Sequence, residues 1–96
     1  MISLQDIRKK KYSILEIAKK NGAKNVRIFG SVSRNEAESN SDIDFLVEFE
    51  DGRSLFDLIN MKLELEDLLQ RKVDIVTEKS LHKIIAAKVM KEAMQL

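Results

Sequence analysis

The strongest constraint on the fold of this chain is a segment in which apolar and charged residues largely alternate, Asp42-Ile43-Asp44-Phe45-Leu46-Val47-Glu48-Phe49. Successive side chains of a β-strand point to opposite faces, so the alternation predicts a strand over 42–49. Its apolar side chains would enter a core, and Asp42 and Asp44 would share the opposite face. Such a strand needs neighbouring strands and a layer that covers its apolar face.

The other hydrophobic patterns supply both. Apolar residues spaced three or four apart predict helices, and short apolar runs predict strands. Strands that alternate with helices favour a small sheet covered by helices. We therefore predict an α/β (α+β) fold with a small mixed three-stranded sheet, in a single domain over residues 1–96. The predicted elements are, in chain order, a helix over 4–20, a strand over 25–29, a helical turn over 33–37, the strand over 42–49, a helix over 54–69, a strand over 71–77 and a last helix that Ser80 opens.

Composition restricts the chemistry that the chain can perform. It has no cysteine and one histidine, His82, which excludes thiolate catalysis and metal sites built from cysteines or several histidines. Catalysis would have to use carboxylates, hydroxyls, lysines or arginines. No apolar run approaches the ~20 residues that span a bilayer, and the first residues lack signal-peptide character. We expect a cytoplasmic protein without membrane contact.

Charge is unevenly distributed although the net charge is only +1. Lysines and arginines dominate residues 1–33 and 68–96, whereas acidic residues dominate residues 34–67. A domain that binds nucleic acid usually has a basic net charge, so we expect no direct nucleic-acid binding. The acidic middle segment contains the residues of greatest chemical interest.

Asp42 and Asp44 form the first candidate site. Side chains two apart on a strand lie on one face, about 6.5–7 Å apart. Two carboxylates at that distance repel each other, so they stay solvated, share a proton or bind a hard cation. When nothing else accompanies the pair, an exposed and polar strand start is the better explanation.

Two further features strengthen the chemical interpretation. Gly30-Ser31 follows a predicted strand, where glycine lets backbone N–H groups approach a phosphate and the serine hydroxyl can donate to it. Asp74 lies between apolar residues of the predicted 71–77 strand. If that strand neighbours the 42–49 strand, Asp74 could complete a cluster of three carboxylates; otherwise it lies on the exposed side of an edge strand.

These residues resemble a known family. The segments Ile28-Phe29-Gly30-Ser31-Val32-Ser33-Arg34, Ser41-Asp42-Ile43-Asp44-Phe45-Leu46-Val47 and Val73-Asp74-Ile75-Val76 resemble the minimal nucleotidyltransferase domain of the polymerase-beta-like superfamily. In particular they resemble the prokaryotic antitoxins paired with HEPN ribonuclease toxins. The resemblance covers residues 22–96, and its most specific motif is Gly-Ser, ten residues, then Asp-x-Asp. The glycine that often follows the motif arginine is Asn35 here.

The resemblance implies a polymerase-beta-like nucleotidyltransferase fold and an enzyme of class EC 2.7.7, a protein adenylyltransferase. It would transfer AMP from ATP to a tyrosine hydroxyl of a HEPN toxin encoded next to it, with Mg²⁺ in a two-ion site, and silence that toxin. One alternative is a non-catalytic antitoxin of the same fold that occludes its partner. Another is nucleotidyl transfer to a small molecule or RNA, against which the lack of an acceptor domain argues.

The resemblance assigns a role to each residue of this chain that matches the family's motif. Gly30 and Ser31 would hold the triphosphate of ATP, and Asp42 and Asp44 would hold Mg²⁺. Asp74 would hold a second metal ion with that pair or accept the proton of the attacking hydroxyl.

The resemblance also assigns Arg34, three residues after the motif serine. Its side chain would steady a phosphate or the following loop. A surface arginine without a role in the reaction is the alternative.

The predicted 54–69 helix has more apolar positions than one buried stripe requires. Leu58, Met61, Leu65, Leu68 and Leu69 suit a core. Phe56, Ile59 and Leu63 form a second flank, which either contacts a partner or is covered by the C-terminal helix.

Overall fold

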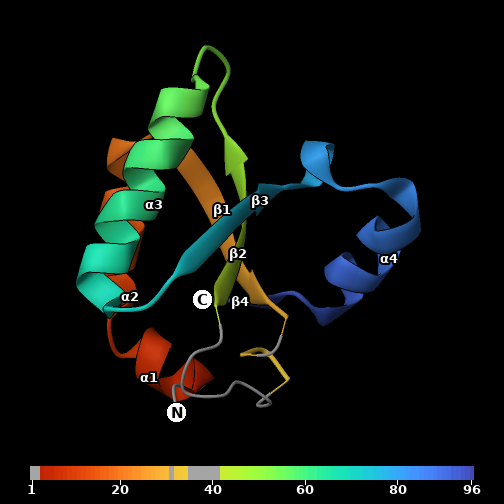
Figure 1. The fold of residues 1–96 in the computed structure, drawn as a ribbon, viewed down its shortest axis with the longest axis horizontal. Coiled ribbons are helices and arrows are strands. Elements are labelled where there is room, and N and C mark those ends of the chain that lie inside the picture. Colours follow the sequence, from red (N-terminus) through yellow and green to blue (C-terminus); the bar gives the residue numbers. More distant parts are fainter. Residues whose placement is uncertain (1–2, 31, 35–41) are drawn as a thin grey trace.

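The structure is a computed structural model that describes residues 3–30, 32–34 and 42–96 (Figure 1). Its elements are α1 (Leu4–Arg8), α2 (Lys11–Lys20), β1 (Ala23–Phe29), β2 (Ile43–Phe49), α3 (Leu55–Leu69), β3 (Val73–Thr77), the 3₁₀ helix η1 (Glu78–Ser80), α4 (Lys83–Glu92) and β4 (Met94–Gln95). Part of the predicted helical turn over 33–37 lies outside the described residues, and residues 32–34 form a turn.

The strands form one mixed sheet in the order β3-β2-β1-β4. β1 pairs antiparallel with β2 and with β4, whereas β2 and β3 run parallel. The predicted mixed sheet covered by helices is confirmed, with four strands in place of three. The fourth, β4, pairs Met94 with Ile28 and Gln95 with Arg27, in a segment predicted as the end of the last helix. Two residues are too few to carry a strand periodicity.

Two helix boundaries also differ from the predictions. The predicted 4–20 helix is two helices, because Lys10 has non-helical backbone angles and its ammonium donates to the carbonyl of Leu68 at 3.1 Å. The last helix begins at Lys83, because Ser80 instead closes η1 in a reciprocal cap with Thr77. The predicted cap of α3 is confirmed: Ser54 and Asp57 form a capping box.

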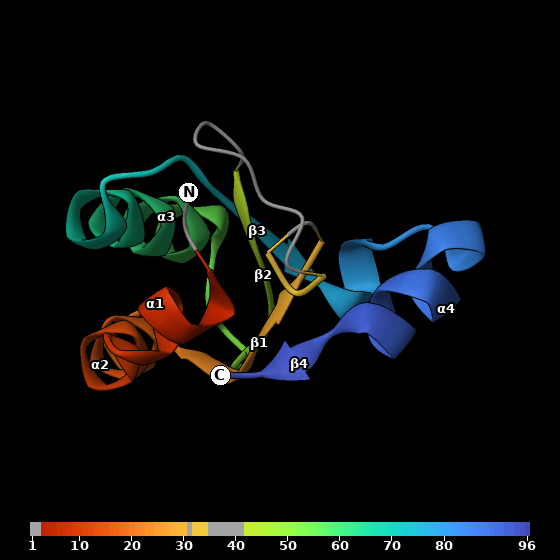
Figure 2. The same cartoon turned by 90° about the horizontal axis from the view of Figure 1, so that it is seen from below.

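The helices lie on both sides of the sheet (Figure 2). α1, α2 and α3 cover one face and bury the main core against β1, β2 and β3, and α4 lies on the other side. Fully buried core side chains from the sheet and these helices are Ile7, Ile14, Ile28, Ile43, Phe45, Val47, Met61 and Leu65. The alternation of β2 therefore directs Ile43, Phe45 and Val47 into this core, as predicted, and leaves Asp44 on the side of α4.

The second apolar flank of α3 is exposed. Met61, Leu65 and Leu69 are buried, while the exposed fractions of Phe56 and Leu63 are 82% and 59%. The alternative that the C-terminal helix covers this flank is wrong, because α4 lies across the sheet from α3 (Figure 2). In the described part of the chain, no helix combines the length and apolar content that crossing a membrane requires.

Candidate active site

The sheet brings two of the predicted acids together at one end of its strands. Asp44 of β2 is the register partner of Asp74 of β3, and on its other side it faces Phe29, the last residue of β1. Adjacent strands lie about 4.8 Å apart, so the two carboxylates project side by side. The condition left open by the sequence, that these strands be neighbours, is met. Asp42 is exposed and lies just before β2 on the same chain segment.

Gly30 lies directly against this acidic pair. Its φ is +77°, and a Cβ at this position would be 2.3 Å from the Asp44 carboxylate oxygen Oδ2. Every other residue type would therefore be strained in its backbone and would collide with Asp44. The backbone of the turn after β1 thus approaches the carboxylate more closely than a side chain would allow. Ser31, the second predicted phosphate-binding residue, lies outside the described residues.

The environment of Asp44 disfavours its negative charge. Partial burial raises the pKa of Asp44, the neighbouring carboxylates of Asp74 and Asp42 raise it further, and the resulting pKa is about 6. The guanidinium of Arg34 acts in the opposite direction. Like charges at close range disfavour joint ionisation, and a cation bound between them would relieve that repulsion. The site is therefore an acidic cluster with one arginine nearby.

The turn after β1 holds Arg34 beside these acids. Val32 is fully buried, the Ser33 hydroxyl donates to the Gly30 carbonyl at 2.8 Å, and the Arg34 amide donates to the same carbonyl at 3.3 Å. The Arg34 side chain donates from Nη1 to Oε2 of Glu92 at the end of α4, at 2.8 Å. Sequence reasoning missed Glu92, since no local pattern connects two residues so far apart in the chain.

The donor chemistry of the acidic cluster fits Mg²⁺, a hard cation that prefers carboxylate oxygens. Among the residues that the structure describes, no three acidic or histidine side chains are drawn together in metal-binding geometry. Asp44 and Asp74 are nevertheless register partners on adjacent strands, and Asp42 lies just before β2. Asp42, Asp44 and Asp74 are thus the residues that would hold a divalent cation, and this role stays a prediction.

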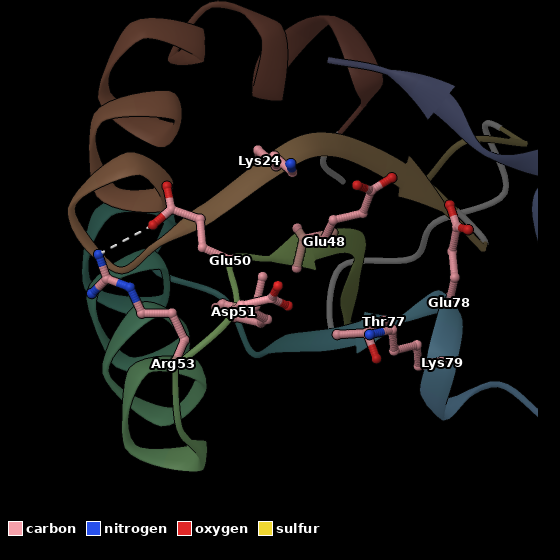
Figure 3. Close-up of a pocket in the computed structure, with 11 residues that line it drawn as sticks. Lys24, Glu48, Glu50, Asp51, Arg53, Thr77, Glu78 and Lys79 are labelled. Carbon is pink, nitrogen blue, oxygen red and sulfur yellow. Dashed lines mark ion pairs between the residues drawn. The ribbon is translucent and has the colours of Figure 1, made fainter.

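A cavity of about 550 Å³ lies at the opposite end of the strands (Figure 3). It is bordered by the end of β2, the following turn and the junction of β3 with η1. Acidic and basic side chains face one another there, and the Arg53 guanidinium lies 3.6 Å from the Glu50 carboxylate. The labelled lining residues are Lys24, Glu48, Glu50, Asp51, Arg53, Thr77, Glu78 and Lys79. Sequence analysis predicted none of them as site residues.

Comparison with known families agrees with this geometry. The family model described as "Nucleotidyltransferase domain" matches residues 11–95. The chain belongs to this family. The predicted enzyme class is thereby confirmed.

Two relatives extend over nearly the full chain of this nucleotidyltransferase. A Methanocaldococcus jannaschii protein provisionally named protein adenylyltransferase MJ0435 is 43% identical and covers 99% of each chain. Protein adenylyltransferase MntA of Thermococcus cleftensis is 38% identical, over 98% of this chain and 96% of its own. The resemblance to minimal nucleotidyltransferase antitoxins is confirmed.

Solved structures confirm the fold of the nucleotidyltransferase. One, provisionally described as a minimal nucleotidyltransferase, is 43% identical with a TM-score of 0.88, and the match covers 99% of this chain and 97% of that chain. A second is a complex of the tri-AMPylated Shewanella oneidensis HEPN toxin with MNT antitoxin. It matches with a TM-score of 0.68 and 21% identity over 92% of this chain and 69% of that chain, a similarity of fold.

Proposed function

We propose that this nucleotidyltransferase is an antitoxin that transfers AMP from ATP to a tyrosine hydroxyl of a HEPN-type toxin and so silences it. The observation that carries the proposal is the in-register pairing of Asp44 with Asp74, with the Asp44 carboxylate directly against Gly30. This arrangement places two carboxylates, which suit a divalent cation, next to a glycine turn whose backbone closely approaches the Asp44 carboxylate. The names of the relatives as protein adenylyltransferases support the same activity.

Each residue of the cluster has a distinct part in this reaction. Asp42 and Asp44 hold Mg²⁺, which when bound neutralises charge on the phosphate oxygens of ATP. The turn of Gly30 and Ser31 supplies backbone and hydroxyl donors to the triphosphate. Asp74 accepts the proton of the acceptor hydroxyl, for which its exposed position on the edge strand β3 suits it.

The transfer requires one bond to form and one to break. The acceptor oxygen attacks the α-phosphorus of ATP, the bond from that phosphorus to the β-phosphate oxygen breaks, and pyrophosphate leaves. The hydroxyl proton passes to the Asp74 carboxylate. The relatives named protein adenylyltransferases support a protein as the molecule that presents this hydroxyl.

A mass measurement tests the proposal. The protein encoded next to this chain is incubated with the purified chain, ATP and MgCl₂, and its intact mass is recorded before and after. We expect a gain of one or more AMP units that is lost without MgCl₂ and with the double variant Asp42→Asn/Asp44→Asn. The toxin's ribonuclease activity should fall in parallel.

A matched control uses acids at the other end of the strands. The variant Glu48→Gln/Asp51→Asn removes the same number of carboxylates there and should transfer AMP at the wild-type rate. If the ribonuclease is neutralised without any mass gain, by wild type and Asp42→Asn/Asp44→Asn alike, the chain is an occluding antitoxin and the enzymatic proposal fails.

A further inference from the structure

The connection between α3 and β3 is short (Figure 1). Gln70 ends α3 in a left-handed conformation, with a φ of +55°, and its amide donates to the Glu66 carbonyl at 2.8 Å. β3 begins three residues later, at Val73. The position of Asp74, the second residue of β3, therefore depends on how this turn is held.

The peptide group that joins Lys72 to Val73 is held from both sides. Its carbonyl oxygen accepts from the amide of Ile43 in β2 at 2.9 Å. Its N–H donates to the Glu66 carboxylate oxygen Oε2 at 3.0 Å, in a partly buried hydrogen bond. Ile43 directly precedes one acid of the cluster, and Val73 directly precedes another. This single peptide group therefore links α3 to both strands at the point where their carboxylates project.

β3 is the outer strand of the sheet, and a repulsion acts across its pairing with β2. Among the strands that the structure describes, β2 is its only neighbour, and the carboxylates of Asp44 and Asp74 repel each other across this pair. Burial of Val73 and Ile75 holds β3 against the core, but hydrophobic attraction is non-directional. A hydrogen bond to a carboxylate is directional and stronger than one between neutral groups. The bond to Glu66 therefore fixes where β3 begins.

We propose that Glu66 is a positioning residue that holds Asp74 where it accepts the proton of the attacking hydroxyl. The inference rests on the proposed function and deepens it, because it extends the site from the strands to α3. Glu66 acts through the amide of Val73 rather than on the reacting atoms. A displacement of about 1 Å in a reacting group lowers a rate by on the order of 10²-fold, so the alignment of Asp74 should affect the transfer step directly.

Two substitutions of Glu66 test this role through the kinetics of AMP transfer to the protein encoded next to this chain. Glu66→Ala removes the acceptor, so kcat should fall by about tenfold or more while KM for ATP changes less than about twofold. Glu66→Gln keeps a side-chain oxygen that accepts from the Val73 amide, and its kcat should stay within about threefold of wild type. In the Asp74→Asn background, Glu66→Ala should lower kcat less than about twofold further, since coupled residues are not additive.

The matched control is Asp57→Ala, at the other end of α3. Asp57 also accepts from a backbone amide, that of Ser54, at 2.9 Å. Both alanine variants should unfold at lower urea concentration than wild type, but Asp57→Ala should keep the wild-type kcat. If Asp57→Ala lowers kcat as much as Glu66→Ala, the effect is a general loss of stability and the inference is wrong. It is also wrong if Glu66→Gln loses as much kcat as Glu66→Ala, or if Glu66→Ala changes KM for ATP alone.

Amide hydrogen exchange of the purified chain, measured by NMR, gives a second readout that needs no toxin. Glu66→Ala should speed exchange of the Val73 and Ile43 amides by about tenfold or more, whereas Asp57→Ala should change it less than about twofold. Exchange at the wild-type rate in Glu66→Ala would overturn the inference.

Failure of this inference can be told apart from failure of the proposed function. If the wild-type chain transfers AMP and Glu66→Ala keeps the wild-type kcat, the enzyme assignment stands and the role of Glu66 falls. If the wild-type chain transfers no AMP, the proposed function fails and the inference fails with it. Faster exchange in Glu66→Ala would then describe the fold alone.

Discussion

The two ends of the β2 and β3 strands differ in how their charges are compensated. At the end that begins both strands, Asp44 and Asp74 lie side by side, and the pKa of Asp44 is raised to about 6. At the other end, a cavity is surrounded by charges of both signs, and Arg53 lies near Glu50 and Asp57. Charges of one sign therefore gather at the first end, whereas charges of both signs face one another at the second.

The difference follows from what each arrangement costs the folded protein. Balanced surface pairs stabilise slightly and have no need of a ligand. A cluster of like charges stores repulsion that a cation or a proton relieves, and groups with strongly perturbed pKa values gather at functional sites for that reason.

The largest expected effect is a loss of AMP transfer when the carboxylates of Asp42 and Asp44 are removed, compared with removal of two carboxylates at the other end of the strands. Asp42→Asn/Asp44→Asn should lower the rate of AMP transfer on the order of 10³-fold, because both carboxylates act on the phosphate charge. Glu48→Gln/Asp51→Asn should change it less than about twofold. Initial rates with radiolabelled ATP measure both. Equal losses of AMP transfer in the two variants would show that the two ends do not differ in their part in the reaction.

The two ends also contain a matched pair of glycines. Gly30 and Gly52 both have positive φ, +77° and +86°, but a Cβ would collide with Asp44 at Gly30 and meets open space at Gly52. Both alanine variants should lose about 1–2 kcal/mol of unfolding free energy from backbone strain. Only Gly30→Ala should also lose transfer activity, by about 10²-fold or more, because the methyl group displaces the Asp44 carboxylate. Urea unfolding and initial rates separate the two effects.

A pH series tests how strongly burial and the neighbouring carboxylates disfavour the ionised form of Asp44. Its folded-state pKa lies above its ordinary value of 3.8, so the ionised carboxylate destabilises the fold above pH 6, and this cost disappears as the pH falls toward 4. We expect Asp44→Asn to raise the unfolding free energy at pH 8 by about 1 kcal/mol, after allowance for solvent screening at a half-exposed group. The gain should shrink steadily between pH 6 and 4. Urea unfolding in EDTA measures it, and a gain independent of pH would contradict it.

The smallest effect on stability and AMP transfer is expected at the end of the strands where Arg53 lies near Glu50 and Asp57. Arg53 lies 3.5 and 3.6 Å from its two acidic neighbours and is one-third exposed. Exposed pairs of this kind contribute about 0–1 kcal/mol. Arg53→Gln should therefore change the unfolding free energy by less than about 1 kcal/mol and leave AMP transfer unchanged. A loss of transfer would show that this end takes part in the reaction.

Sequence reasoning succeeded where neighbouring residues determine the structure. The capping box of Ser54 and Asp57 depends on residues three apart, and the alternation of β2 depends on the period of a strand. The adjacency of Asp44 and Asp74 could be stated only as a condition, because it depends on which strands pair. The family resemblance supplied what local patterns lacked, namely the order of the site residues along the chain.

The features that sequence reasoning missed depend on contacts between distant segments. Glu92 meets Arg34 because α4 packs on the face of the sheet opposite α3, and no periodicity in either segment predicts that pair. β4 is too short to have a pattern of its own. The break at Lys10 coincides with a hydrogen bond to Leu68 at the end of α3.

The arrangement of the sheet's outer strands has a consequence for self-association. Unpaired strand edges invite other chains to add to the sheet and so promote aggregation. β4 occupies the outer edge of β1 at Arg27 and Ile28. The opposite edge, β3, is five residues long and exposes the carboxylate of Asp74. A charged, short edge resists pairing, so the acid proposed to receive a proton in catalysis also keeps neighbouring molecules from extending the sheet.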